Sequence, residues 1–132
     1  MDKAIISKLI EAAIEAKSNS YSPYSKFAVG AAILCKDGNI YRGCNIENGA
    51  YPTSICAERV ALFKAVSEGE RDFIGIAIVS SSSEITPPCG ACRQALSEFV
   101  REDFDVILAK SKDDYKTFLF AELLPLSFKL EK

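Results

Sequence analysis

The sequence lacks any cluster of lysine and arginine residues. Its 16 basic and 18 acidic residues give a formal net charge of −2 over 132 residues. Proteins that bind nucleic acids usually carry a basic patch, because contacts with phosphates supply much of their affinity. The composition therefore argues against a nucleic-acid partner and favours a small ligand with little or no charge.

Long hydrophobic runs are also missing. The longest apolar run, residues 27–35, is far shorter than the roughly 20 residues that a membrane-spanning helix needs. A secretory signal peptide requires an uninterrupted apolar stretch, and the N-terminal segment instead carries charges at Asp2, Lys3, Lys8, Glu11 and Glu15. We therefore expect no membrane partner and a cytoplasmic protein. In that compartment, five cysteines, an odd number, indicate thiols or metal ligands rather than disulfides.

Internal repeats, low-complexity tracts and linker-like stretches are absent as well. A chain of 132 residues, of which 48% are hydrophobic, can build one sizeable core. We therefore expect a single domain that covers residues 1–132.

The pattern of apolar residues and turn signals predicts an α/β fold. Asp37-Gly38 indicates a hairpin turn, Thr53 or Ser54 can cap the second helix, and Gly69 can end it. The last connection is too short for a crossover, so the last two strands should be antiparallel. The expected architecture is a three-layer α/β/α fold with a mixed five-stranded sheet. The expected helices cover residues 3–17, 55–68 and 89–101, and the expected strands cover 27–35, 39–46, 73–80, 104–110 and 115–120.

Two short motifs place thiols at the expected starts of two helices. Cys56-x-Glu58 begins one helix, and Cys89-x-x-Cys92 begins the next. Residues three apart share one face of a helical turn, and the positive end of a helix favours the thiolate that zinc needs. Three protein ligands leave the fourth tetrahedral position of zinc open, as in catalytic sites. We expect Cys56, Cys89 and Cys92 to hold one Zn²⁺ per subunit.

Glu58 is the candidate catalytic residue. The open position of the metal would hold water, whose pKa zinc can lower to about 7. A carboxylate two residues from a ligand can accept that proton and pass protons to the substrate. With Pro88 directly before Cys89, the pattern is that of the zinc deaminases, in which hydroxide attacks C4 of cytosine.

Other interpretations of these cysteines stay open at this point. Cys89-x-x-Cys92 could be a redox pair, or half of a structural zinc site completed by Cys56 with Cys35 or Cys44. Because Cys35 and Cys44 fall in expected strands, we interpret them as small apolar residues.

Beyond these motifs, the sequence resembles the small tetrameric cytidine deaminases over nearly its whole length. Three cysteines without a histidine match the ligand set of this class, whereas larger deaminases use one histidine and two cysteines. The resemblance implies zinc-dependent hydrolysis of cytidine and 2′-deoxycytidine to uridine and 2′-deoxyuridine, with release of ammonia, in pyrimidine salvage. The segments that carry it are residues 22–34 (SPYSKFAVGAAIL), 45–62 (NIENGAYPTSICAERVAL), 87–99 (PPCGACRQALSEF) and 122–128 (ELLPLSF).

The resemblance also implies which residues bind the substrate. Phe27 would stack against the pyrimidine ring, and the backbone of Ala57 would meet the base carbonyl. Asn45 and Glu47 would form hydrogen bonds with the ribose hydroxyls. Because the charge of Glu47 repels phosphate, a free pyrimidine nucleoside fits better than a nucleotide.

Three further residues acquire roles from the same resemblance. Phe128 would close the active site of a neighbouring subunit and Tyr51 would reach across to it, in a homotetramer with shared active sites. Arg59 would donate hydrogen bonds to the zinc thiolates, whose complex with Zn²⁺ carries a net charge of −1, and Arg93 is a second candidate for this role.

Three functions remain open on the sequence alone. The first is deamination of cytidine and deoxycytidine. The second is hydrolytic deamination of a different ring, as in a blasticidin-type deaminase. The third is a zinc-binding module without catalysis, which would require a fourth protein ligand on the metal.

Overall fold

Five strands form one mixed sheet in the computed structural model, which describes all 132 residues. The strand order is β2-β1-β3-β4-β5, and every neighbouring pair is antiparallel except β3 with β4. The parallel pair requires a crossover, and α3 supplies it. The strands are β1 (Val29–Cys35), β2 (Ile40–Cys44), β3 (Phe73–Ser80), β4 (Asp105–Ser111) and β5 (Asp114–Leu119).

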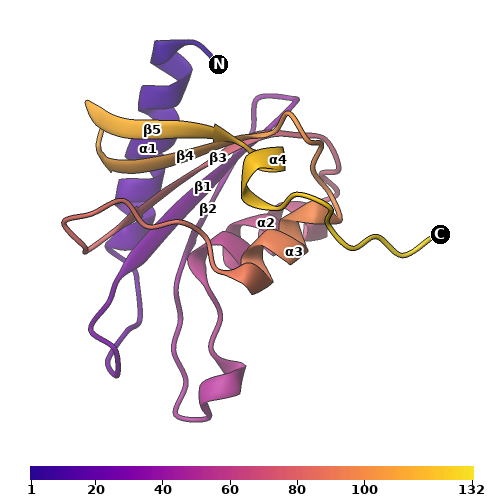
Figure 1. Ribbon diagram of the computed structural model, residues 1–132. Helices are drawn as coiled ribbons and strands as arrows, with labels where there is room; N and C mark the ends of the chain where they lie inside the picture. The colour runs from indigo at the N-terminus through magenta and orange to yellow at the C-terminus, as the bar shows by residue number, and fades with distance from the viewer.

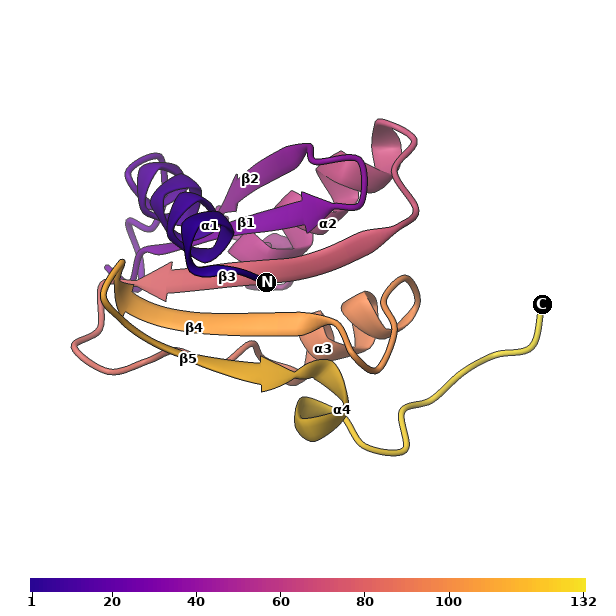
Figure 2. The ribbon, with the colours of Figure 1, turned by 90° about the horizontal axis from the view of Figure 1, so that it is seen from above.

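Helices cover both faces of this sheet (Figures 1 and 2). Helix α1 (Lys3–Lys17) packs on one face, and α2 (Ala57–Ser67) and α3 (Gly90–Ser97) pack on the other. Alternate residues of the central strands therefore enter two separate cores, with Ala32 and Ala77 facing α1 and Ile33 and Ile78 facing α2. The prediction of a three-layer α/β/α fold is confirmed. None of the helices has the length and apolar character that crossing a bilayer requires.

Helix α2 begins later than the sequence pattern predicts. Residues 51–53 form a short 3₁₀ helix, η1 (Tyr51–Thr53), and the N-cap of α2 is Cys56. The Ser54 hydroxyl accepts a hydrogen bond from the backbone N–H of Asn48 at 3.0 Å instead of capping the helix. As a result, Cys56 stands at the cap position and Glu58 lies in the first helical turn.

Other element boundaries also differ from the expected ones. Strand β1 starts at Val29 rather than at residue 27, because the chain is still in a loop at Lys26, where φ is +60°. Helix α3 ends at Ser97, four residues short of the predicted end. A short helix that the pattern did not predict, α4 (Phe120–Leu123), follows β5, and the Glu122 side chain accepts from the backbone N–H of Leu119 at 2.8 Å.

A glycine allows α2 to lie very close to the sheet. Gly43 of β2 faces the first turns of α2, and a Cβ atom there would come within 2.4 Å of the Ala57 carbonyl oxygen and of the Ala61 nitrogen. Because any side chain at residue 43 would push the helix away, this glycine fixes the height of the start of α2 above the sheet.

Candidate active site

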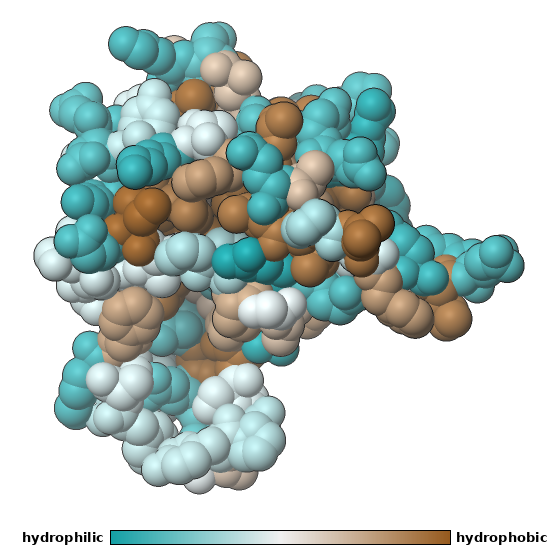
Figure 3. All heavy atoms as spheres, viewed as in Figure 1, coloured by the Kyte–Doolittle hydropathy of each residue, from teal (hydrophilic) through white to brown (hydrophobic).

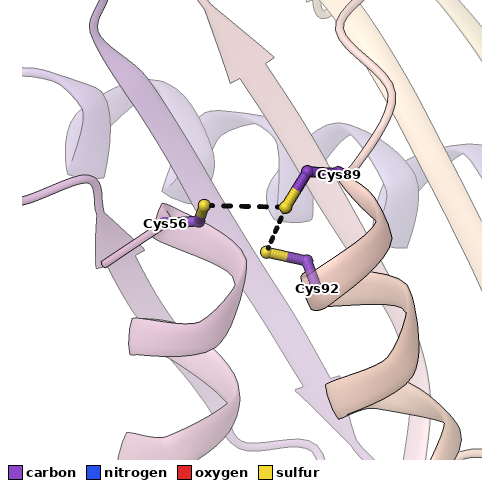
Figure 4. A group of neighbouring side chains, drawn as sticks. All are labelled: Cys56, Cys89 and Cys92. Carbon is purple, nitrogen blue, oxygen red and sulfur yellow. Dashed lines mark hydrogen bonds between the residues drawn. The ribbon is translucent and has the colours of Figure 1, made fainter. Parts of the chain in front are cut away.

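The starts of α2 and α3 lie side by side and bring three thiols together (Figure 4). The Sγ atoms of Cys56 and Cys89 are 3.8 Å apart, and those of Cys89 and Cys92 are 3.5 Å apart. All three sulfur atoms lie within 4.8 Å of one another. The structure therefore places together the three residues that the sequence motifs single out.

The spacing of these sulfur atoms fits a tetrahedral metal ion. All three cysteines are free, and their separations far exceed the roughly 2.05 Å of a disulfide bond. Zn–S bonds of about 2.3 Å at tetrahedral angles place neighbouring sulfur atoms roughly 3.8 Å apart. No fourth metal-ligating side chain joins the group, and Cys35 lies instead with Asp37 and Glu70. A structural site completed by Cys35 or Cys44 is therefore not formed.

Arg59 supplies positive charge beside the thiols. Its Nη2 atom donates to Cys56 Sγ at 3.4 Å, and its Nε atom is buried without a partner in the chain. Hydrogen bonding with Cys92, followed by that with Arg59, lowers the pKa of Cys56 to about 5. The same interaction with Cys56 raises the pKa of Cys92. An arginine in this position fits an anionic sulfur cluster.

Glu58 is the buried carboxylate of the site. Only 5% of the residue is exposed, although its side chain is ionisable and it lies in the first turn of α2. Burial raises the pKa of Glu58 to about 7, and the nearby Cys56 adds to the rise. A carboxyl group with such a pKa can both accept and release protons near neutral pH. Next to three thiols that fit a metal, it defines the site of a metal-dependent hydrolase.

A cavity of about 290 Å³ opens beside Glu58. This volume lies just below the range typical of small-ligand pockets, about 300–1,000 Å³. Every residue that was predicted to bind the substrate within its own subunit lines this cavity. Its walls include Phe27, Asn45, Glu47, Ala57 and Glu58, together with Cys56 and Cys89 of the sulfur group.

Asn45 joins β2 to the loop that carries Phe27. Its Nδ2 atom donates to the Phe27 carbonyl at 2.7 Å, and its Oδ1 atom accepts from the backbone N–H of Val29 at 2.9 Å. One N–H of the amide remains for a ligand. Asn45 therefore combines a structural role with a place in the cavity wall.

Glu47 is bound to the same loop. One of its carboxylate oxygens accepts from the backbone N–H groups of Tyr24 at 3.0 Å and Ser25 at 3.1 Å, and the other accepts from the Ser25 hydroxyl. These hydrogen bonds, that of the Ser25 hydroxyl first, lower the pKa of Glu47. The cavity wall thus carries an ionised carboxylate.

Tyr51 and Phe128 do not reach this cavity within one subunit. Tyr51 is 72% exposed on η1 and makes an edge contact with Tyr24, with ring centroids 6.0 Å apart. Phe128 is 68% exposed on a C-terminal segment that projects from the body of the molecule (Figures 1 and 3). The two aromatic rings that were predicted to serve the site of a neighbouring subunit therefore make no part of the cavity in their own subunit.

Arg93 does not donate to the thiols, the role for which the sequence made it a candidate. Its Nε atom donates to the Pro88 carbonyl at 2.8 Å and its Nη1 atom donates to the Leu123 carbonyl at 2.6 Å, so it links the Cys89 turn to α4 rather than binding sulfur. Sequence reasoning also missed Ser25 and Thr86, which line the cavity. Their nearness in sequence to Phe27 and Cys89 was the signal that could have identified them.

Comparisons with known proteins agree with this site. Residues 3–108 match the family model of the cytidine and deoxycytidylate deaminase zinc-binding region. A cytidine deaminase of Halalkalibacterium halodurans is 50% identical over 123 residues, which cover 93% of each chain. The crystal structure of cytidine deaminase from Burkholderia pseudomallei gives a TM-score of 0.87 at 42% identity and covers 92% of this chain and 97% of that chain. A blasticidin-S deaminase of Bacillus cereus is 33% identical over 129 residues, 92% of this chain and 90% of its own.

The chain therefore belongs to the cytidine and deoxycytidylate deaminase family. The predicted class of enzyme, a hydrolase of the deaminase type, is confirmed by this membership. The family model is that of a zinc-binding region, which agrees with the three-cysteine group of the structure.

Proposed function

We propose that this protein is a single-domain enzyme, residues 1–132, that hydrolyses cytidine and 2′-deoxycytidine to uridine and 2′-deoxyuridine with release of ammonia, in cytoplasmic pyrimidine salvage. The observation that carries the proposal is the buried carboxyl group of Glu58, which lines a cavity of about 290 Å³ together with Cys56 and Cys89 of the three-thiol group. Family membership narrows this hydrolase chemistry to deamination.

Glu58 carries the proton transfers of the proposed reaction. Cys56, Cys89 and Cys92 would hold one Zn²⁺ per subunit, which would act as a Lewis acid and could lower the pKa of water to about 7. Glu58 accepts a proton from the attacking water, whose oxygen adds to C4 of the base. It gives this proton to N3, then takes the second proton from the new C4 hydroxyl and passes it to the amine, which leaves as ammonia as the C4–N bond breaks.

The remaining residues hold the substrate and adjust the charge of the site. Phe27 stacks on the pyrimidine ring, the Ala57 backbone meets the base carbonyl, and Asn45 and Glu47 bind the ribose hydroxyls. Ionised Glu47 repels a phosphate, so the substrate is the free nucleoside. Arg59 offsets the net charge of −1 that three thiolates leave on Zn²⁺.

The activity assay is the loss of cytidine ultraviolet absorbance, with the protein as purified, after chelation and after return of zinc. We expect turnover that the chelator abolishes and zinc restores. A parallel assay with blasticidin S tests the second candidate function, which the relationship to a blasticidin-S deaminase raises. Because the cytidine deaminase relative is more similar, we expect cytidine to react faster; zinc-loaded protein that leaves cytidine unchanged would contradict the proposal.

Glu58→Gln tests the proton transfers. The amide has the same shape but cannot carry protons, so we expect kcat to fall by at least about 10²–10⁴-fold while zinc content is retained. Glu84→Gln is the matched control, because Glu84 is a solvent-exposed carboxylate at the surface. Comparable deamination rates for the two variants would remove Glu58 from the mechanism.

We also propose a homotetramer in which subunits share active sites. Tyr51, Leu126 and Phe128 support it, because they expose apolar surface that association would bury. Mixing Glu58→Gln subunits with Phe128→Ala subunits tests the shared site. Some mixed tetramers would combine an intact Glu58 with an intact Phe128, so activity should exceed the average of the two parents. Activity equal to that average, or an active monomer in light scattering, would exclude sharing.

A further inference from the structure

Lys26 has a backbone conformation that few lysines adopt. Its φ angle is +60°, in the left-handed region, where residues other than glycine, asparagine and aspartate are uncommon. The side chain is exposed, so packing does not account for the conformation. Strained backbone persists only where the surrounding structure imposes it, and it concentrates at functional sites.

The residues on both sides of Lys26 are held in place by hydrogen bonds. The Lys26 N–H donates to the Ser22 carbonyl at 3.0 Å, which closes a tight turn before it. The Phe27 N–H donates to the Ser25 hydroxyl at 3.0 Å, and the Phe27 carbonyl accepts from Asn45 at 2.7 Å. The peptide that joins Lys26 to Phe27 is therefore fixed from both ends.

The consequence of this turn is the direction of Phe27. The chain bends at Lys26, so the Lys26 side chain lies in solvent while the next side chain lines the cavity with Ala57 and Glu58. Regular extended backbone begins only at Val29, three residues after Lys26. An extended conformation at residue 26 would redirect Phe27 and move its ring from the cavity wall.

We propose that Lys26 is a positioning residue whose left-handed backbone holds the Phe27 ring against the pyrimidine base. This inference rests on the proposed function, since it assigns the base to the Phe27 side of the cavity. The ammonium group itself is not required, because it has no hydrogen-bond or ion-pair partner in the structure, although its charge lies near Glu47.

Two substitutions separate the backbone from the charge. Lys26→Asn and Lys26→Val both remove the ammonium, but asparagine tolerates the left-handed region and β-branched valine does not. We expect Lys26→Val to raise KM for cytidine roughly tenfold with kcat within about twofold, because stacking acts equally on substrate and transition state. Lys26→Asn, the conservative variant, should restore KM to within about twofold of the wild-type value. Lys116→Val, at an exposed and extended position of β5, is the matched control.

A double-mutant cycle with Phe27→Ala gives the decisive measurement. If Lys26 acts through Phe27, Lys26→Val should no longer raise KM once the ring is removed. Calorimetric binding of uridine provides a readout independent of turnover, and thermal denaturation shows that each variant is folded. Should Lys26→Val not fold, Lys26→Ala replaces it, with an intermediate rise in KM expected.

Equal KM values for the asparagine and valine variants, or an unchanged effect of valine in the Phe27→Ala background, would overturn the inference. These results would leave the proposed function intact, because wild-type turnover of cytidine tests that function separately.

Discussion

Two cysteines of this molecule show opposite behaviour although their side chains are the same. Cys56 stands at the cap of α2 beside two thiols and Arg59, and its pKa falls to about 5. Cys35 lies in β1 with 1% exposure, near Glu70, and burial followed by that carboxylate raises its pKa to about 12. The difference teaches that the groups facing a thiol decide its chemistry: donors and a cation favour the thiolate, whereas burial beside a carboxylate favours the thiol.

The largest expected effect is on zinc content, which should distinguish the thiol group of Cys56, Cys89 and Cys92 from the group that contains Cys35. Cys89→Ala should reduce bound zinc from one per chain to nearly none and abolish deamination, because only two of three ligands remain. Cys35→Ala, the matched control, should keep its zinc. Elemental analysis of the purified variants measures this difference. Equal zinc content in the two variants would contradict the assignment of the metal site to the group that contains Cys89.

A smaller effect is expected when the cation beside Cys56 is removed. Arg59→Gln should lower activity or zinc affinity by about 10–100-fold, because the thiolates lose their hydrogen-bond donor and its charge. Arg42→Gln serves as the control, since Arg42 pairs with Glu15 at an exposed position. The measurements are steady-state kinetics and a competition assay with a zinc chelator. A rate equal to that of the control would show that the guanidinium does not tune the cluster.

The smallest effect concerns the stability that Cys35 confers at alkaline pH. In the unfolded chain this thiol loses its proton above its ordinary pKa of 9.0, whereas in the folded protein it keeps the proton until about pH 12. Unfolding is therefore favoured as pH rises above 9. Between pH 8 and pH 10, the wild type should lose about 1 kcal/mol more free energy of unfolding than Cys35→Ala. Denaturant titrations at the two pH values measure this, and parallel losses would contradict the assignment.

The sequence predicts the sheet and the helices well, because their signals are local. The alternation and burial of residues such as Ile33 and Ile78 determine the strands. The boundaries were less accurate where tertiary contacts compete with local preference. Ser54 has the chemistry of a helix cap, yet its hydroxyl serves Asn48 in the preceding loop. Lysine has no preference for the left-handed conformation, so the residue type did not indicate the turn at Lys26, and β1 was expected to begin two residues early.

The candidate site was predictable to the extent that its residues lie in motifs. Cys56, Cys89 and Cys92 follow from spacing and helix starts, and Phe27 and Asn45 follow from family resemblance. Ser25 and Thr86 come from loops whose approach to the cavity depends on folding of the whole chain. Tyr51 and Phe128 are exposed and lie outside the cavity of their own chain, so one folded chain does not test the contacts with a neighbouring subunit that we propose for them.

The missing side chain at Gly43 couples the position of β2 to the geometry of the site at the start of α2. A methyl group at residue 43 would press on the Ala57 carbonyl, and the first turn of the helix would have to move as a unit. Cys56 and Glu58 would then shift together, so that the thiol leaves its two partners and the carboxyl group leaves the substrate. The backbone at residue 43 therefore constrains the geometry of the candidate site although it contributes no side chain to it.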